Sequence, residues 1–309
     1  MHVFLTGATG FIGGYILREL RRRGHTARCL VHNPDNRLAE EGPAVEKVVG
    51  DVTEAASLEG TLDGCDAVIH LVGIIEEKPA EDVTFEAVHV EGTIHVVRAA
   101  KEAGVDRFLH MSANGAAPDG VSPYHTTKWR AEQYVKDAGF AHWTIFRPSI
   151  VFGDAGDRPE FASRLARTLV ALFPILPVFG DGTYQLQPVA VEEVAAAFVQ
   201  ALDREAANGR IFCAAGRESL AYTTVLNYIT QALGQPLKPK LFLPLWFARP
   251  FVQLLSRLGL VPISIDQFDM LVAGNVCDAA AFYETFDVEY TPFLPENLAY
   301  LRKQRSVAA

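Results

Sequence analysis

Tyr124 and Lys128 are the pair of side chains whose types and spacing are best suited to acid–base chemistry. Ser122 and Pro123 precede them as an N-cap and a first helical residue would, so the pair is expected on one face of a helix. A free tyrosine has a pKa of about 10 and is a poor acid at neutral pH. We expect the ammonium one turn away to lower that pKa, so that Tyr124 exchanges a proton with a substrate oxygen. Ser112, at the end of an expected strand, could hold the same oxygen by hydrogen bonding.

Tyr-x-x-x-Lys pairs also occur by chance, with the ring packed under the lysine stem, so the elements that position the pair matter. Apolar runs alternate with helical patterns through the first two thirds of the chain, which is typical of a parallel sheet covered by helices on both faces. The expected strands are Val3–Thr6, Thr26–Val31, Val45–Val49, Ala67–Leu71, Arg107–Met111, His142–Phe146 and Arg210–Cys213. The expected helices are Tyr15–Arg23, Phe85–Ala103, Pro123–Asp137 and Val189–Leu202. The pattern predicts an α/β fold with a doubly wound parallel sheet, the Rossmann architecture.

A second, smaller and mostly helical domain is expected beside this sheet. Prolines and aromatic residues replace the strand and helix alternation around Phe161–Phe179, and proline-rich helical stretches follow Leu220. We therefore assign residues 1–152 and 186–215 to the Rossmann domain. Residues 153–185 and 216–309 are assigned to a substrate domain.

A glycine-rich turn follows the first expected strand and opens a helix, which is the context required for dinucleotide binding. Gly7 permits the tight turn, Gly10 lets a pyrophosphate approach the backbone, and Gly13 lets the helix lie close to the sheet. The intervening residues expected to bind the cofactor are Thr9, Phe11 and Ile12. A bound nicotinium ring would further lower the pKa of Tyr124 while the cofactor exchanges hydride.

The end of the second strand bears on the choice between NAD and NADP. A carboxylate there would bind the ribose 2′-hydroxyl of NAD, and a cation the 2′-phosphate of NADP. Val31 stands where the acid is expected, and His32 follows it. The sequence favours NADP(H), since His32 can donate a hydrogen bond to a phosphate. NAD(H) stays an alternative, in which His32 is an ordinary solvent-exposed loop histidine.

Further cofactor contacts are expected at the ends of the third and fourth strands. Asp51, followed by Val52, could accept a hydrogen bond from the adenine amino group or act as an N-cap-like turn residue. Gly73, shortly after Leu71, could let the backbone approach the cofactor ribose.

Composition excludes several classes of function. The chain has 309 residues, with 28 lysines and arginines against 37 acidic residues and a net charge of −9, which argues against a duplex nucleic-acid binder. The four cysteines lack zinc-site spacing, so no metal site is expected. No run of about 20 apolar residues predicts a transmembrane helix. The chain starts directly with a strand-like run, which favours a cytoplasmic location.

The segment Leu241–Leu255 is strongly apolar with one arginine. It could line a pocket for a hydrophobic substrate such as a quinone or isoprenoid, or lie on a membrane surface. Alternatively it is a core helix of the second domain, interrupted by Pro244 and Pro250.

The glycine turn and the Tyr124/Lys128 pair together resemble the short-chain dehydrogenase/reductase superfamily. The chain is similar to its extended, atypical branch, which is NAD-dependent epimerase/dehydratase-like and includes the 39-kDa accessory subunit of respiratory complex I and its bacterial relatives. The matching stretches are Thr6–Gly14, Val68–Ile75, Val88–Thr93, Gly104–Ala113, Thr144–Gly153, Gln187–Ala195 and Val261–Asp278.

This resemblance implies that Lys128 also bonds the nicotinamide ribose and that Pro148 and Ser149 lie beside the carboxamide. His89 stands where many members carry an asparagine that holds a water for a proton relay. A histidine can relay protons as well, or it can be a packing residue in a branch that has stopped catalysing. The accessory subunits bind the nucleotide without an established turnover.

Three functions follow as alternatives. The first is an oxidoreductase that transfers hydride to or from a carbonyl or quinone-like substrate. The second is a nucleotide-sugar epimerase or dehydratase, for which Arg158, Arg164 and Arg167 are candidate diphosphate ligands. The third is a non-catalytic nucleotide-binding accessory or assembly protein, associated with a membrane surface or a respiratory complex.

Overall fold

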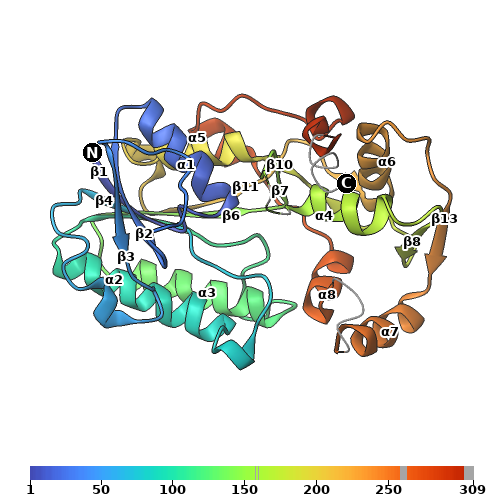
Figure 1. Ribbon diagram of the computed structural model, residues 1–309, viewed down its shortest axis with the longest axis horizontal. Helices are drawn as coiled ribbons and strands as arrows, with labels where there is room; N and C mark the ends of the chain where they lie inside the picture. The colour runs from blue at the N-terminus through green and yellow to red at the C-terminus, as the bar shows by residue number, and fades with distance from the viewer. Residues whose placement is uncertain (157, 159, 258–262, 303–309) are drawn as a thin grey trace. The chain divides into compact units, whose positions relative to one another are not determined.

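The computed structural model describes residues 1–156, 158, 160–257 and 263–302 (Figure 1). Residues 261–262 of the family-like stretch and residues 303–309 of the predicted second domain lie outside this part of the chain. Contacts divide the chain into two units. The first contains Met1–Pro148, Glu192–Ala214 and Ala280–Val288, and the second contains Ser149–Val191, Ala215–Ala279 and Glu289–Ala309.

A seven-stranded parallel sheet forms the centre of the first unit, with strand order β11-β6-β5-β4-β1-β2-β3. Its strands are β1 (His2–Thr6), β2 (Thr26–Val31), β3 (Val45–Val49), β4 (Ala67–His70), β5 (Arg107–Met111), β6 (His142–Pro148) and β11 (Arg210–Ala214). The inner strands are buried on both faces, so continuous apolar runs rather than alternating ones encode them. The predicted doubly wound Rossmann sheet is confirmed.

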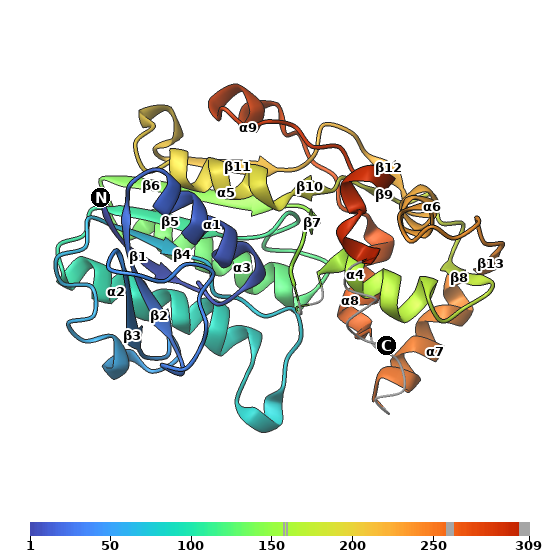
Figure 2. The ribbon, with the colours of Figure 1, turned by 45° about the horizontal axis from the view of Figure 1, so that its top comes forward.

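Helices cover both faces of this sheet, with α2 and α3 on one face and α1 and α5 on the other (Figures 1 and 2). The helices of this unit are α1 (Phe11–Arg22), α2 (Gly92–Glu102), α3 (Pro123–Asp137), α5 (Val191–Gln200) and α9 (Ala280–Thr285), with short turns η1 (Ala55–Leu58), η2 (Pro79–Glu81), η3 (Glu86–Glu91) and η5 (Glu205–Ala207). The helix expected to begin at Phe85 instead opens with η3, a π-helical turn, before α2. Such turns commonly mark functional sites.

The boundaries of the first unit differ from the predicted ones at Ala280–Val288, which the sequence assigned to the second domain. The reason is packing: the Phe286 ring lies 4.9 Å from that of Phe212 and 5.4 Å from that of Phe146. The Tyr283 hydroxyl also donates to Glu193, at 2.7 Å. Residues 149–152 and 186–191, in turn, group with the second unit.

The second unit is smaller and contains a helical C-terminal region, as predicted. Its elements are β7 (Val151–Phe152), α4 (Phe161–Leu165), η4 (Ala166–Val170), β8 (Leu176–Phe179), β9 (Gln185–Leu186), β10 (Val189–Ala190), β12 (Leu220–Ala221), α6 (Tyr222–Ala232), β13 (Lys240–Leu243), α7 (Leu245–Arg257), α8 (Ile265–Ala273) and η6 (Pro295–Leu298). Helix α6 and turn η4 share its core, which includes Val225, Leu226 and Val170. None of the helices in the described ranges is long and apolar enough to cross a membrane.

Candidate functional site

The glycine turn joins β1 to α1 and has the geometry that its sequence predicts. Gly7 has φ +74°, a left-handed conformation that glycine adopts without strain, and its carbonyl accepts from the Gly10 N–H at 2.9 Å. A side chain on Gly7 would come within 3.2 Å of the Cβ of Leu71. Gly10 is the N-cap of α1 and has no side chain to occupy the space in front of the helix. The turn thus presents backbone N–H groups and a positive helix end, which fits a pyrophosphate.

Gly13 is the most sterically restricted glycine of the turn. A Cβ at this position would lie 2.1 Å from the Gly7 carbonyl oxygen and 2.8 Å from its carbon. These are backbone atoms, which cannot move aside without opening the turn. The absence of a side chain at Gly13 therefore lets α1 begin directly against the turn, rather than against the sheet as the sequence suggested.

Lys128 is buried, and main-chain carbonyls position its ammonium group. Its Nζ donates to Met111 O at 3.0 Å and to Val72 O at 3.4 Å, where β5 and β4 end. Burial lowers the pKa of Lys128 to about 8, and the negative charge of Glu132 only partly offsets this. A Cβ on Gly73 would lie 2.8 Å from Nζ. Gly73 was predicted to let the backbone approach the cofactor ribose; in the structure the absence of a side chain at Gly73 makes room for Lys128.

Tyr124 lies one turn before Lys128 on α3, as predicted, but its acidity differs from the prediction. Burial raises the pKa of Tyr124 to about 12, with no compensating contribution from the lysine, whose ammonium is directed to the two carbonyls. The ring is half-buried among aromatic side chains, with edge-to-face contacts to Phe85 at 5.9 Å and to His89 at 5.4 Å. The hydroxyl is therefore a protonated phenol at neutral pH, which can donate a proton.

Ser112 follows β5 directly and is 4% exposed. Its backbone N–H donates to Phe146 O at 2.7 Å, which fixes it beside β6. Its hydroxyl is buried and has no hydrogen-bond partner within the described part of the chain. A buried polar group without a partner is costly, and a ligand oxygen that accepted its proton would offset this cost.

His89 belongs to η3, and its two ring nitrogens tie α3 to the loop after β4. His89 Nδ1 lies 3.0 Å from Thr127 Oγ1, and Nε2 lies 3.0 Å from Ile74 N and 3.1 Å from Ile74 O. Both ring nitrogens therefore have a hydrogen-bond partner in either neutral tautomer. Burial and the Lys128 charge lower the pKa of His89 to about 2. The imidazole is neutral and fully engaged, so the geometry favours a positioning role over a proton relay.

A second histidine network, which the sequence did not predict, connects the end of β1, just before the glycine turn, with β4, α2 and η3. Thr93 Oγ1 donates to His89 O at 2.6 Å and therefore accepts from His70 Nε2–H at 3.2 Å. His70 Nδ1 in turn accepts from Thr6 Oγ1 at 2.8 Å. Thr6 and His70 occupy paired positions on β1 and β4. The only sequence signal for this network is a polar residue in each otherwise apolar strand.

His32 and Asp51 lie together at the carboxyl ends of β2 and β3. His32 Nδ1 is 3.2 Å from Asp51 Oδ2, and the His32 side chain is 68% exposed. Asp51 Oδ1 accepts from the Thr53 N–H and hydroxyl, both at 2.8 Å. Asp51 is thus a turn-capping residue, the second of its two predicted roles, with one carboxylate oxygen directed toward His32.

The remaining predicted cofactor residues lie at the ends of the central strands or just beyond. Val52 and Leu71 are buried, and Val52 O accepts from His95 Nδ1 at 2.8 Å. Pro148 ends β6, and its carbonyl accepts from the Asn114 N–H at 2.9 Å. Ser149 begins the second unit, where its hydroxyl donates to Gln187 O.

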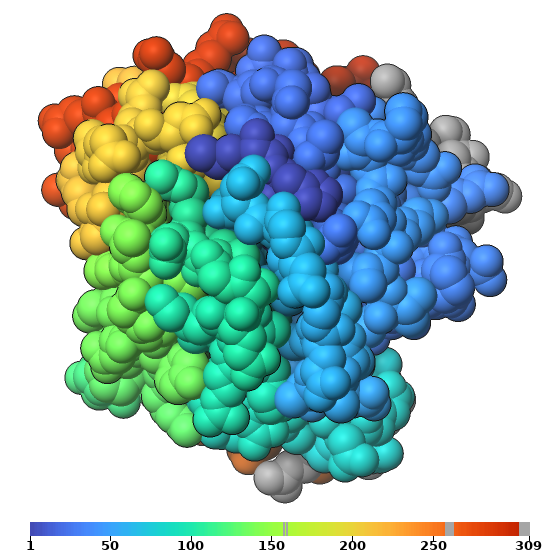
Figure 3. All heavy atoms as spheres, turned by 90° about the vertical axis from the view of Figure 1, so that its left-hand side faces the viewer, coloured from blue at the N-terminus to red at the C-terminus, as the bar shows by residue number. Residues whose placement is uncertain are grey.

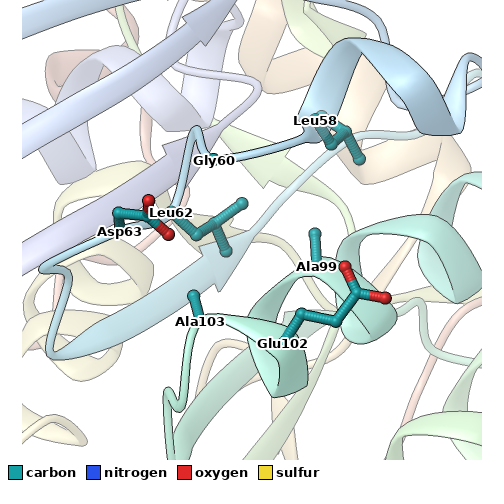
Figure 4. Close-up of a pocket in the computed structure, with 7 residues that line it drawn as sticks. All are labelled: Leu58, Gly60, Leu62, Asp63, Ala99, Glu102 and Ala103. Atoms are coloured by element: carbon teal, nitrogen blue, oxygen red, sulfur yellow. The ribbon is translucent and has the colours of Figure 1, made fainter.

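A small pocket of about 80 Å³ lies at the opposite, amino-terminal side of the sheet. Leu58, Gly60, Leu62, Asp63, Ala99, Glu102 and Ala103 line it (Figure 4). Figure 3 views this side of the first unit, where the light blue segment adjoins the teal end of α2. Ligands of open parallel sheets bind at the carboxyl ends of strands, so we do not assign the dinucleotide to this pocket.

Comparison with known proteins agrees with the site's chemistry. The sequence profile of the NAD dependent epimerase/dehydratase family matches residues 3–215, which is more than half of the chain. In fold, the chain is similar to MoeE5 in complex with UDP-glucuronic acid and NAD, with a TM-score of 0.76 and 20% identity over 100% of both chains.

Three curated relatives differ in how much of each chain they share with this one. The 40 kDa subunit of NADH-ubiquinone oxidoreductase from Neurospora crassa is 32% identical over 63% of this chain and 50% of the subunit. The 3 beta-hydroxysteroid dehydrogenase/Delta 5→4-isomerase of Mycobacterium tuberculosis is 35% identical over 52% of this chain and 49% of the relative. Subunit 9 of the NADH dehydrogenase 1 alpha subcomplex from Mus musculus is 28% identical over 97% of this chain and 79% of the subunit. The chain thus matches about half the length of the first two relatives.

Proposed function

Because the chain belongs to the NAD dependent epimerase/dehydratase family, we propose that it is an NAD(P)H-dependent oxidoreductase that acts on a carbonyl or quinone-like substrate. The buried Ser112 hydroxyl, which has no hydrogen-bond partner in the described part of the chain, carries this proposal, because a substrate oxygen could accept its proton. Lys128 donates to the carbonyl of Met111, the residue before Ser112, and Tyr124 lies one helical turn from Lys128. Lys128 thus connects the strand end that precedes Ser112 with the helix that carries Tyr124.

The residues at the carboxyl ends of the strands fit a dinucleotide. The Gly7–Gly13 turn would hold the pyrophosphate, Asp51, Val52, Leu71 and Gly73 would border the adenosine and ribose, and Lys128, Pro148 and Ser149 the nicotinamide half. When bound, the nicotinamide supplies or accepts the hydride.

The protein's own groups manage the proton. Tyr124 is protonated at neutral pH and donates to the substrate oxygen as negative charge develops there, while Ser112 holds that oxygen in place. Lys128, with a pKa of about 8, is mostly protonated at neutral pH, and its ammonium would hold the nicotinamide ribose when the cofactor is bound. His89 keeps the helix that carries Tyr124 fixed to the Ile74 loop.

We propose NADP(H) as the preferred cofactor. Val31 removes the acidic side chain that would bind the 2′-hydroxyl of NAD, and His32 supplies a donor for a 2′-phosphate. The opposing feature is Asp51, whose carboxylate lies beside His32. We also propose a small hydrophobic substrate, in keeping with the steroid named for the mycobacterial relative, and a cytoplasmic location, which cell fractionation would test.

The test is a turnover screen with three substrate classes: hydrophobic ketones, quinones and UDP-sugars. Oxidation of NADPH and NADH is followed by absorbance for the first two, and sugar conversion by chromatography for the third. Tyr124→Phe should lose roughly 10²–10⁴-fold in kcat while cofactor affinity stays unchanged, because the ring still packs. Conversion of a UDP-sugar alone would favour the epimerase alternative; full activity of Tyr124→Phe would refute Tyr124 as the acid.

A second candidate is a nucleotide-binding accessory protein, favoured by the match to the mouse subunit over 97% of this chain. In that case no substrate class turns over, and the nucleotide acts only by raising stability through mass action. Thermal melts with and without NADPH, combined with affinity purification of a respiratory complex, distinguish this role from catalysis.

A further inference from the structure

The second unit exposes a group of large apolar side chains, which we name the aromatic face. It comprises Phe173, Phe242, Trp246, Phe247, Phe251 and Leu254. Trp246 is 79% exposed and Leu254 58% exposed. Single exposed apolar residues are ordinary, but a contiguous group marks an interaction site.

Contacts within the second unit bring together the elements that carry these residues. Strand β13 pairs in parallel with β8, with Phe242 opposite Val178, and Pro244 leads directly from β13 into α7. Lys238, just before β13, donates to Phe173 O at 2.9 Å. On α7 the Phe247 and Phe251 rings stack 5.9 Å apart. The face therefore combines one strand, one helix and the segment before β8 (Figure 2).

Helix α7 is apolar on two sides, although its own unit covers only one of them. Ala248 and Val252 are buried against Phe268 of α8. Phe247, Phe251 and Leu254 follow the helical spacing on a different side and remain exposed. A surface helix normally presents polar residues there, so this side of α7 is built to contact something other than water.

Charge identifies the kind of partner. The two segments that carry the face, residues 161–177 and 236–257, contain six lysines and arginines and no acidic residue. The rest of the chain has 28 − 6 = 22 basic against 37 acidic residues, a net charge of −15. Arg249 is paired with Asp269 of α8, at 2.8 Å. Helix α8, which packs against α7, adds Asp266 and Asp269, so the excess over these segments is 6 − 2 = 4 positive charges. The segments that carry the face are thus cationic in an acidic protein.

We propose that the aromatic face binds the interfacial region of a bilayer that contains anionic lipids. Tryptophan and phenylalanine partition into this region, and lysine and arginine are attracted to anionic headgroups. Helix α7 has 13 residues and contains Pro250, so it is suited to lie in the interface and not to span it. A site of this kind would let the protein collect hydrophobic molecules from a membrane, but the inference depends only on the second unit and not on the proposed catalysis.

The experiment is co-sedimentation of the full chain with vesicles. Vesicles of equal parts phosphatidylcholine and phosphatidylglycerol should bind the protein, those of phosphatidylcholine alone should bind it more weakly, and added salt should reduce the difference. The double variant Trp246→Gln/Phe251→Gln should lower the partition coefficient roughly tenfold or more. Val49→Gln/Val121→Gln, at positions of the first unit that are 53% and 55% exposed, is the matched control and should bind like the wild type.

Fluorescence locates the contact. Brominated phosphatidylcholine in the anionic vesicles should quench Trp246, and Trp246→Phe should retain binding and lose most of that quenching. Binding that is equal in the double variant and the control, or no binding to anionic vesicles, would overturn the proposal. Self-association of the wild type in gel filtration, abolished by the double variant, would instead assign the face to a second copy of the chain and also overturn it. Thermal melts verify that each variant is folded.

Discussion

Two regions of the molecule differ from the usual rule that apolar groups are buried and polar groups are exposed. The carboxyl end of the sheet in the first unit, which we call the polar region, buries polar groups, and the aromatic face of the second unit exposes apolar ones. Around Tyr124 the protein buries polar groups, including the unpartnered Ser112 hydroxyl and the Lys128 ammonium. On α7 it exposes apolar ones, with Trp246 the most exposed. Both arrangements cost stability in the isolated chain. The two regions therefore favour different contacts: the Ser112 hydroxyl can bind a polar group, and the aromatic face can bind an apolar surface.

The two regions should respond very differently to substitution, and the largest expected effect is at Gly13. In Gly13→Val the new Cβ would meet Gly7 O at 2.1 Å, so the turn must open. We expect a loss of about 4 kcal/mol or more in unfolding free energy and no measurable NADPH binding. Trp246→Ala, in the exposed region, should change unfolding free energy by less than about 0.5 kcal/mol. Urea denaturation and calorimetry measure both.

Gly24→Ala is the control for glycine substitution as such. Gly24 has φ +80° and open space around its Cβ position, so only backbone strain of about 1 kcal/mol is expected. If Gly13→Val were no worse than Gly24→Ala, the tight approach of α1 to the turn would not matter for folding, and the contrast between the two regions would weaken.

The next effect is the pH dependence that Lys128 imposes on stability. Burial lowers its pKa to about 8, whereas the unfolded chain keeps the proton until about pH 10.5. Between these values the unfolded state binds more protons, so unfolding free energy rises with pH by about 1.4 kcal/mol per unit, or about 3 kcal/mol in total. Lys128→Met has no ammonium group to titrate. The unfolding free energy of the wild type relative to this variant should therefore increase by about 3 kcal/mol from pH 8 to pH 10.5.

The comparison with the variant is necessary because two thiols act in the opposite direction. Burial raises the pKa of Cys29 to about 12 and that of Cys65 to about 11, so unfolding releases their protons earlier and stability falls above about pH 9. These thiols are the same in both proteins and cancel in the difference. A difference that does not change with pH would show that Lys128 titrates as an exposed lysine does.

Much of the first unit could be predicted from the sequence because local signals and burial agree there. The strands of the sheet are short apolar runs, and Gly7, Gly10 and Gly13 have spacing that only a turn against a helix explains. The pairing of Tyr124 and Lys128 follows from helix spacing alone. By contrast, Ala280–Val288 is separated from the rest of its unit by a long stretch of chain, and only its aromatic packing on Phe146 and Phe212 places it.

The electrostatics of the site could not be predicted from spacing. The sequence indicates that an ammonium lies one turn from Tyr124, but not that Met111 O and Val72 O bind it. Those carbonyls come from loops and strand ends that meet only in the folded sheet. The neutral state of His89 likewise depends on its burial and on the nearby Lys128 charge, which lower its pKa and which spacing does not show.

A smaller effect is expected at Ser112, whose buried hydroxyl lowers the stability of the folded protein but is proposed to be needed for activity. Ser112→Ala removes a buried hydroxyl that has no partner, so unfolding free energy should rise by about 1 kcal/mol while turnover falls. Melting curves test the expected gain in stability, and kcat on the substrate found by screening tests the expected loss of turnover. Thr144→Val is a control from the same sheet, since it removes a buried hydroxyl that donates to Ala207 O at 2.9 Å and should therefore lower the unfolding free energy. A destabilised Ser112→Ala would mean that the hydroxyl has a structural role.

The smallest expected effect concerns cofactor choice at the edge of the polar region, where His32 is exposed and screened by solvent. We expect NADPH to bind more tightly than NADH by roughly 3- to 10-fold, because the His32 ring can donate a hydrogen bond to the 2′-phosphate. His32→Ala should abolish this preference. Asp51→Asn should increase it, because the substitution removes a carboxylate 3.2 Å from His32 that competes for the same donor. Dissociation constants of both cofactors test the prediction: tighter NADH binding by the wild type would show that Asp51 takes over the role of the missing acid at Val31, and the charge of this edge would then select against phosphate.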